Sequence, residues 1–199
     1  MVSLRNQDQV VFIDLERGLR EEWTFGSDGD HDTLYEQHNP DYIPPERGGP
    51  ALLVADSENG RVVEYQRENG DWVQSWTWGD ERLQWPRDAD RLPNGHTLVT
   101  DSNGDRVLEV DTNSTVVWSA TIGFPYEAER LGTGEESTGG RSAAALDLAT
   151  EVARSSSDRS LEQLAVMLAM GERPQTAREL LPEPAEADVI EALMGLAEA

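Results

Sequence analysis

The sequence predicts a mainly β protein, a partial β-propeller of about three meander blades followed by a small C-terminal α-helical appendage. Three observations support this fold class. A unit of short strands recurs along the first part of the chain, and each copy alternates apolar and polar residues between turns rich in Asn, Asp and Gly. Beyond a linker that follows residue 131, residues 141–199 are rich in Ala, Leu and Glu and lack aromatic residues, which favours helix.

The clearest copy of the repeated unit lies between Trp85 and Gly123. Its alternation predicts strands at 89–92, 97–100, 106–110 and 115–118, separated by turns at 93–95, 101–104 and 111–114. Four short strands in a period of about 40–50 residues are typical of one propeller blade.

Other copies flank this unit. ADSENGRVVEY aligns with TDSNGDRVLEV at an offset of 45, which places Asp56 opposite Asp101 and Arg61 opposite Arg106. Upstream, residues 40–44 match residues 89–93, a weaker copy at 6–14 ends at Gly26, and a further copy begins at 125–131. Because the Asp and Arg recur at fixed places, we expect Asp to turn the chain and Arg to tie blades together. The tryptophans in or beside strands are expected to pack between blades; these are Trp72, Trp76, Trp78, Trp85 and Trp118.

The chain is expected to divide into three parts. Residues 1–131 form the partial propeller, residues 132–141 a linker of Gly, Ser and Thr, and residues 142–199 a helical tail. In the tail, apolar residues recur at helical spacing in two stretches; these are Leu161, Leu164, Ala165 and Leu168, then Ile190, Leu193, Met194 and Ala197.

Composition limits the partners. The net charge is -23, the sixteen basic residues are all arginine, and there is no cysteine. Such a chain repels nucleic-acid phosphates, so no nucleic acid is expected as a partner. No run approaches the ~18 apolar residues of a membrane span and none has signal-peptide character, so a soluble cytoplasmic protein is expected. The acidic, lysine-free composition favours a high-salt environment, with an acidic protein of ordinary salt as the alternative.

The phrases QHNPDYIP, ADSENGRVVEY, LQWPRDADRLPNGHTLVTDSNGDRVLEVD and PYEAERLGTGEES resemble the arylsulfotransferase-like propellers, particularly those of haloarchaea, over about residues 4–140. The resemblance implies a six-bladed propeller whose innermost strands line a central funnel. It also implies sulfuryl transfer from an aryl sulfate donor to a phenolic acceptor without a nucleotide cofactor, in which a funnel histidine accepts the sulfuryl group.

Carried onto this chain, the strand-start positions of the resemblance fall on His38 and Arg87. His38 would be the nucleophile or a sulfuryl contact, since neutral imidazole is a good nucleophile, and Arg87 would stabilise charge on the sulfuryl oxygens. The alternatives are a hydrogen-bonded structural His38 and an Arg87 paired with Asp88 or Asp90. No cofactor and no metal site is expected; the 28–32 loop has alternating aspartates but lacks the Gly and Glu positions of an EF-hand.

About three blades are fewer than the 4–8 that close a propeller, so strand edges are expected to be exposed. A second copy of the chain could complete the ring. The chain could also be a truncated remnant, or part of a longer protein. A non-catalytic binding or scaffold module is therefore the alternative function.

Overall fold

The computed structural model describes residues 1–134 and 136–150. They belong to one compact unit, Met1–Ala153. The two helical stretches predicted around 161–168 and 190–197 lie outside the described residues. Within the described part, no helix is long and apolar enough to cross a membrane.

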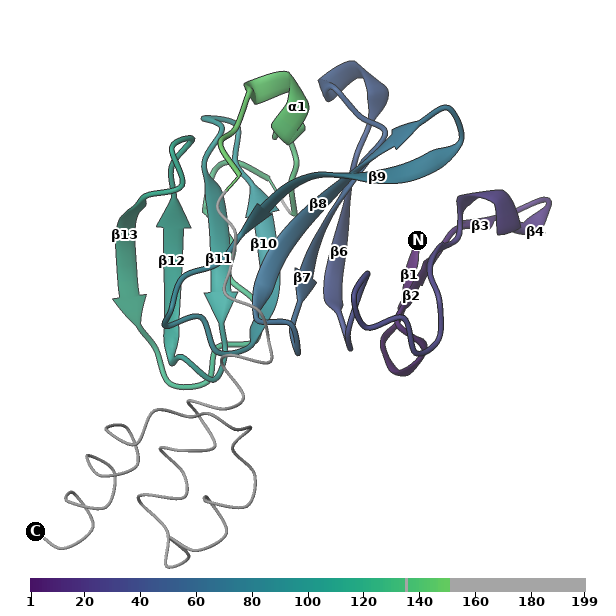
Figure 1. Cartoon of the computed structure of the whole chain (residues 1–199). Helices are drawn as coiled ribbons and strands as arrows, with labels where there is room; N and C mark the ends of the chain where they lie inside the picture. Colours follow the sequence, from purple (N-terminus) through teal and green to yellow (C-terminus); the bar gives the residue numbers. More distant parts are fainter. Residues whose placement is uncertain (135, 151–199) are drawn as a thin grey trace, which may run out of the picture. The chain divides into compact units, whose positions relative to one another are not determined.

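Two four-stranded antiparallel sheets form most of this unit (Figure 1). The first contains β6 (His38–Ile43), β7 (Ala51–Asp56), β8 (Arg61–Glu68) and β9 (Asp71–Trp78), in that spatial order. The second contains β10 (Pro86–Arg91), β11 (Thr97–Asp101), β12 (Arg106–Val110) and β13 (Val116–Thr121). Every strand pairs with its neighbours in sequence, so both sheets are meanders. The mainly β, partial propeller-like fold class is confirmed.

The N-terminal copy forms a smaller sheet. It contains β1 (Val2–Leu4), β2 (Gln9–Val11) and β5 (Phe25–Gly26), and a separate hairpin pairs β3 (Ile13–Asp14) with β4 (Gly18–Leu19). Gln9 pairs with Gly26, so this copy ends where the sequence predicted. Three short 3-10 helices occupy connections, η1 (Arg5–Gln7), η2 (Glu21–Trp23) and η3 (Pro45–Arg47).

The register confirms that the repeated residues are equivalent. Asp56 pairs with Arg61 at the turn between β7 and β8, and Asp101 pairs with Arg106 at the turn between β11 and β12. The two sheets are therefore copies of one unit, with β6 and β10 in matching places.

The largest apolar core contains residues of both four-stranded sheets, including Leu53, Val62, Val99 and Leu108. Trp76 and Trp78 lie in this core, as predicted, with exposures of 2% and 1%. A second core joins the N-terminal sheet to β7 and β8; its members are Val10, Phe25, Leu34, Leu52, Val54, Val63 and Tyr65. The expectation for Trp118 was wrong, because on the outer strand β13 it has no sheet to cover it and is 49% exposed.

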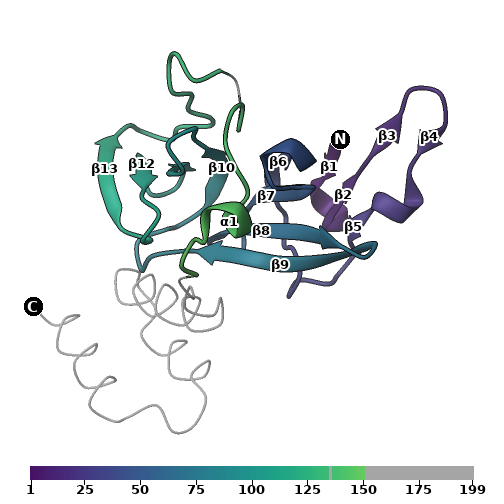
Figure 2. The ribbon, with the colours of Figure 1, turned by 90° about the horizontal axis from the view of Figure 1, so that it is seen from above.

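The chain after β13 returns along the inner strands (Figure 2). Ser137 and Gly140, in the segment expected to be a linker, are buried. A Cβ on Gly140 would lie 1.9 Å from the Arg91 carbonyl oxygen, so this segment contacts β10 closely. It ends at α1 (Ala143–Leu146), where the Ser142 side chain accepts the Ala145 amide hydrogen bond as an N-cap.

Candidate functional site

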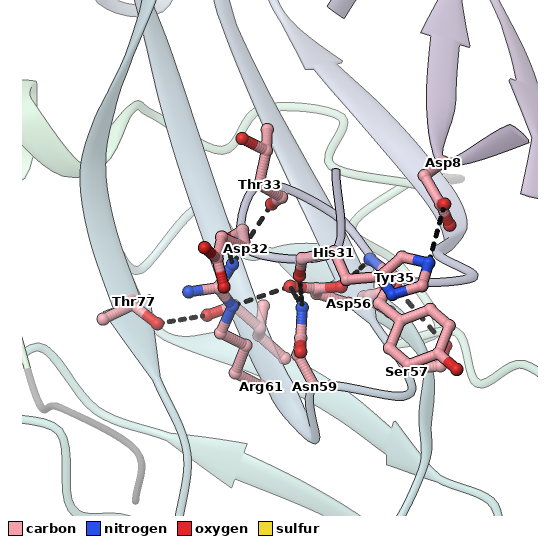
Figure 3. A network of polar contacts seen from close by, with 12 residues as sticks. Asp8, His31, Asp32, Thr33, Tyr35, Asp56, Ser57, Asn59, Arg61 and Thr77 are labelled. Atoms are coloured by element: carbon pink, nitrogen blue, oxygen red, sulfur yellow. Dashed lines mark hydrogen bonds and ion pairs between the residues drawn. The ribbon is translucent and has the colours of Figure 1, made fainter. Parts of the chain in front are cut away.

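The repeated aspartates hold each sheet to the connection that precedes it. Asp56 Oδ1 accepts a hydrogen bond from the Tyr35 amide at 2.7 Å, and Asp56 Oδ2 accepts one from Arg61 Nε at 2.6 Å (Figure 3). Asp101 makes the matching contacts: its Oδ1 accepts from the Gln84 and Trp85 amides, and its Oδ2 accepts from Arg106 Nε at 2.9 Å. This geometry supports the structural role expected for the recurring Asp and Arg.

The serine that follows each of these aspartates donates a hydrogen bond to the segment with which the next copy of the repeat begins. Ser57 Oγ donates a hydrogen bond to the Pro86 carbonyl at 2.6 Å, where β10 begins. Ser102 Oγ donates to the Pro125 carbonyl in the same way. Both serines are buried, so each bond is shielded from water.

The contact between Ser57 and His38 fixes the tautomer of the histidine. His38 Nδ1 lies 2.7 Å from Ser57 Oγ. A serine hydroxyl has one proton, and the Pro86 carbonyl, which can only accept, takes it. The proton in the His38–Ser57 contact is therefore assigned to His38 Nδ1, which places the lone pair of the neutral ring on Nε2.

The charge state of His38 follows from its surroundings. Burial, then the positive charges of Arg87 and Arg5, lower its pKa from 6.5 to about 4. The imidazole is therefore neutral at pH 7. A neutral ring with an unprotonated Nε2 can act as a nucleophile or a general base.

Arg87 lies beside His38 among aromatic rings. Its Cζ is 4.3 Å from the Trp85 ring centroid and 4.6 Å from that of Tyr126, and the His38 ring meets Trp85 edge-on at 5.3 Å. Within the described part of the chain Arg87 forms no salt bridge, and its Nε is buried without a hydrogen-bond partner. The alternative pairing with Asp88 is not found, because Asp88 accepts from the Asn39 side chain and the Ala128 amide.

A group of carboxylates that the sequence analysis did not select lies further along the inner strands. Asp41 on β6 and Asp90 on β10 have equivalent registers, paired with Leu53 and Leu98. Ligand oxygens of Asp41, Asp90 and Glu136 all lie within 4.8 Å of one another, and Glu136 also belongs to a second such group. We call the two groups together the inner acidic cluster; its members are Asp41, Asp90, Glu127, Glu129 and Glu136.

Burial raises the free energy needed to ionise the two buried members of this cluster, Asp41 and Asp90. Asp41 and Asp90 are 4% and 2% exposed. Burial raises the pKa of Asp41 to about 8, and burial with the nearby Asp88 and Asp41 charges raises the pKa of Asp90 to about 10. Ser137 donates its amide to Asp41 Oδ2 at 2.7 Å, whereas Asp90 Oδ1 has no hydrogen-bond partner.

A cleft of about 400 Å³ opens onto the inner acidic cluster. Asn39, Asp41, Arg47, Glu127 and Glu136 are among its lining residues. His38 and Arg87 are not, so the two sequence-predicted site residues and the acidic cluster are different parts of the inner-strand surface.

The sequence did hold a signal for the cluster. Asp41, Asp90 and Glu129 stand at the same place in three aligned copies, each just after Pro40, Ala89 or Ala128. The alignment showed that these positions are equivalent, but only the folded structure shows that the carboxylates of Asp41 and Asp90 lie close together. The aspartates of the 28–32 loop, in contrast, are in no group of carboxylates close enough to share an ion among the described residues.

Comparisons with known proteins show a distant likeness of fold. No family model matches the sequence, and no curated protein matches it. The periplasmic gluconolactonase of Pseudomonas aeruginosa matches 62% of this chain and 36% of its own length, with 20% identity and a TM-score of 0.47. A luciferin-regenerating enzyme matches 57% of this chain and 36% of its own, with 13% identity and a TM-score of 0.43. This chain thus spans about a third of the solved structures it resembles.

Proposed function

We propose that this protein transfers a sulfuryl group from an aryl sulfate donor to a phenolic acceptor, with His38 as the nucleophile and Arg87 as the oxyanion contact. The observation that carries the proposal is the hydrogen bond from His38 Nδ1 to Ser57, which places the lone pair of the neutral ring on Nε2. Histidine that is neutral at pH 7 and held in one tautomer is suited to nucleophilic attack.

The chemistry needs two displacements at sulfur. In the first, His38 Nε2 forms a bond to sulfur while the bond from sulfur to the aryl oxygen breaks, and the phenolate leaves with the electron pair. In the second, the oxygen of the phenolic acceptor attacks sulfur, its proton passes to solvent, and the bond between Nε2 and sulfur breaks. Neither displacement requires a nucleotide.

Local charge favours an anionic substrate at His38 despite the net charge of -23. Arg87 and Arg5 both lower the pKa of His38, which means that both act on the ring as positive charges. The planar guanidinium of Arg87 matches sulfuryl oxygens. Beside it, the rings of Phe124 and Tyr126 are 58% and 54% exposed and offer contact area for an aryl group.

The test is nitrophenol release from nitrophenyl sulfate with phenol as acceptor, in 0.15 M and 2 M KCl. Release by the wild type, its loss in His38→Gln, and its retention in His96→Gln are expected. His96 is a matched control because its Nδ1 contacts Glu109 on a different hairpin. Mass spectrometry of the quenched enzyme should detect a sulfuryl group on His38. No release from the wild type, or release unchanged in His38→Gln, rejects the proposal.

A second candidate function is a non-catalytic binding module that pairs with another copy of itself. It is favoured by exposed apolar residues on and after the edge strand β13; these are Val117, Trp118, Ile122, Phe124, Tyr126 and Leu131. Two copies would repel each other in dilute salt, and ~1 M salt shortens the Debye length to about 3 Å. Under this second candidate function, the chain therefore associates with another copy of itself in a high-salt environment. Light scattering should detect a dimer in 2 M KCl that dissociates in 0.1 M KCl; a monomer in both rejects it.

A further inference from the structure

We propose that Asp41, Asp90 and Glu136 bind a divalent cation, with Ca²⁺ as the preferred ion. The three side chains come from β6, from β10 and from the returning segment that precedes α1. Their ligand oxygens all lie within 4.8 Å of one another, a spacing at which one ion can contact all three.

The unpartnered oxygen of Asp90 is the independent observation that points to a ligand. Asp90 is 2% exposed, and its Oδ1 is buried with no hydrogen-bond partner. Buried polar atoms are almost always satisfied, so an unpartnered oxygen on a buried member of this carboxylate group points to a bound positive group. No Arg is paired with Asp90 or Asp41 within residues 1–134 and 136–150.

The donor set selects the kind of ion. All three ligands are carboxylate oxygens, which suit hard cations and disfavour Zn²⁺ or copper. Ca²⁺ accepts six to eight oxygens in irregular geometry at about 2.3–2.6 Å, whereas Mg²⁺ needs a near-ideal octahedron at about 2.0–2.1 Å. Three carboxylates on separate segments fit the less demanding ion. The cleft of about 400 Å³ beside Asp41 and Glu136 has room for the waters that would complete its shell.

A cation here would also join separate parts of the fold. Asp41 already accepts the Ser137 amide at 2.7 Å, and Ser137 Oγ in turn accepts the Arg91 amide at 2.8 Å. The site therefore lies where the two inner strands and the returning segment are held together. Binding should raise the thermal stability of the unit, since any ligand that prefers the folded state does so.

Calorimetric titration with CaCl₂ tests the proposal on protein freed of metal with EDTA and dialysed into buffered KCl. One saturable site is expected for the wild type, with weaker binding of MgCl₂. Asp90→Asn and Glu136→Gln should each weaken Ca²⁺ binding at least ~10-fold, because each removes one charged ligand. Asp71→Asn is the matched control, since it removes the same charge from an exposed position outside the cluster.

Two results would overturn the proposal. The first is a calorimetric heat that does not saturate as CaCl₂ is added, or Ca²⁺ binding that weakens as much in Asp71→Asn as in the cluster variants. Either result would indicate diffuse screening of an acidic chain. The other is the absence of Ca²⁺ binding together with the infrared band of a protonated carboxylic acid at pH 7 that Asp90→Asn removes. That outcome would assign the cluster as a proton-sharing pair. Glu136 is exposed, so Glu136→Gln keeps the test valid if Asp90→Asn alters folding. Neither readout depends on His38 or on sulfuryl transfer.

Discussion

Arg91 on β10 and Glu64 on β8 form an ion pair in which both side chains are wholly shielded from solvent. Their Nη2 and Oε2 atoms are 3.0 Å apart, and the guanidinium also lies 4.6 Å from the centroid of the Trp76 ring. Glu64 accepts a further hydrogen bond from the Ala143 amide at 2.7 Å. The pair therefore links both four-stranded sheets to the start of α1.

Replacing Arg91 with Met should destabilise the protein by about 3–5 kcal/mol, because it leaves the Glu64 carboxyl buried without its ion-pair partner. Urea unfolding at pH 7 measures the change. Adding Glu64→Gln to this variant should recover part of the loss, since the neutral amide can still accept from Ala143. A double variant less stable than Arg91→Met alone would contradict this explanation.

The matched control is the solvent-accessible pair of Arg20 and Glu22, whose side chains are 32% and 57% exposed. Glu22→Gln should leave the urea midpoint close to that of the wild type, because solvent screens exposed ion pairs.

Ser57→Ala should lower the stability of the protein and alter the tautomer of His38, whereas Ser102→Ala should only lower the stability. Both variants lose a buried hydrogen bond to the next inner segment, so each should cost about 1–3 kcal/mol. Ser57→Ala also removes the acceptor of His38 Nδ1. Nitrogen chemical shifts of the His38 ring should show the Nδ1–H tautomer in the wild type and in Ser102→Ala, and a tautomer mixture in Ser57→Ala. An Nε2–H tautomer in the wild type would contradict the assignment.

Much of the fold could be predicted because its signals are local. The repeat offset placed Asp56 and Asp101 in matching turns, and alternation located β12 at its observed bounds, Arg106–Val110. His38 and Arg87 fell at strand starts that the structure brings into contact with the same ring, Trp85. The roles proposed for them remain predictions.

The structural features that the sequence did not predict depend on contacts between segments far apart in the chain. The Gly-rich composition of 132–141 indicated a linker, yet Ser137 forms hydrogen bonds with Asp41 and Arg91. Composition alone does not indicate such contacts. The inner acidic cluster was missed for the same reason, because Asp41 and Asp90 meet only when β6 and β10 lie side by side. The burial of Arg91 likewise follows from its partner on β8.

The pKa of His38 predicts a window of acid sensitivity. Its folded-state pKa of about 4 is below its ordinary 6.5, so protonation favours the unfolded chain. The stability that neutral His38 contributes is fully present above pH 6.5 and is lost as the pH falls through about 4. The stability difference between the wild type and His38→Gln, followed by urea unfolding from pH 4 to 8, should therefore shrink toward acid. Carbon chemical shifts of the ring should titrate near pH 4; a midpoint near 6.5 would refute this.

The pKa of Asp90 predicts a pH dependence of stability opposite to that predicted for His38. Its folded-state pKa of about 10 is above its ordinary 3.8, so the folded protein binds the proton more tightly than the unfolded chain. The resulting contribution to stability is complete below pH 3.8 and is lost as the pH rises toward 10. In EDTA, Asp90→Asn, which cannot ionise, should therefore exceed the wild type in melting temperature by a margin that grows from pH 5 to pH 8.

Saturating Ca²⁺ should reverse this order at pH 8, since the ion stabilises the ionised carboxylate of the wild type and loses a ligand in Asp90→Asn. The same melting measurements in CaCl₂ provide the comparison, with Asp71→Asn as the control for charge alone. If Asp90→Asn melts below the wild type in EDTA at every pH, the buried carboxyl stabilises the fold by itself, and this result would contradict the stability cost assigned to its ionisation.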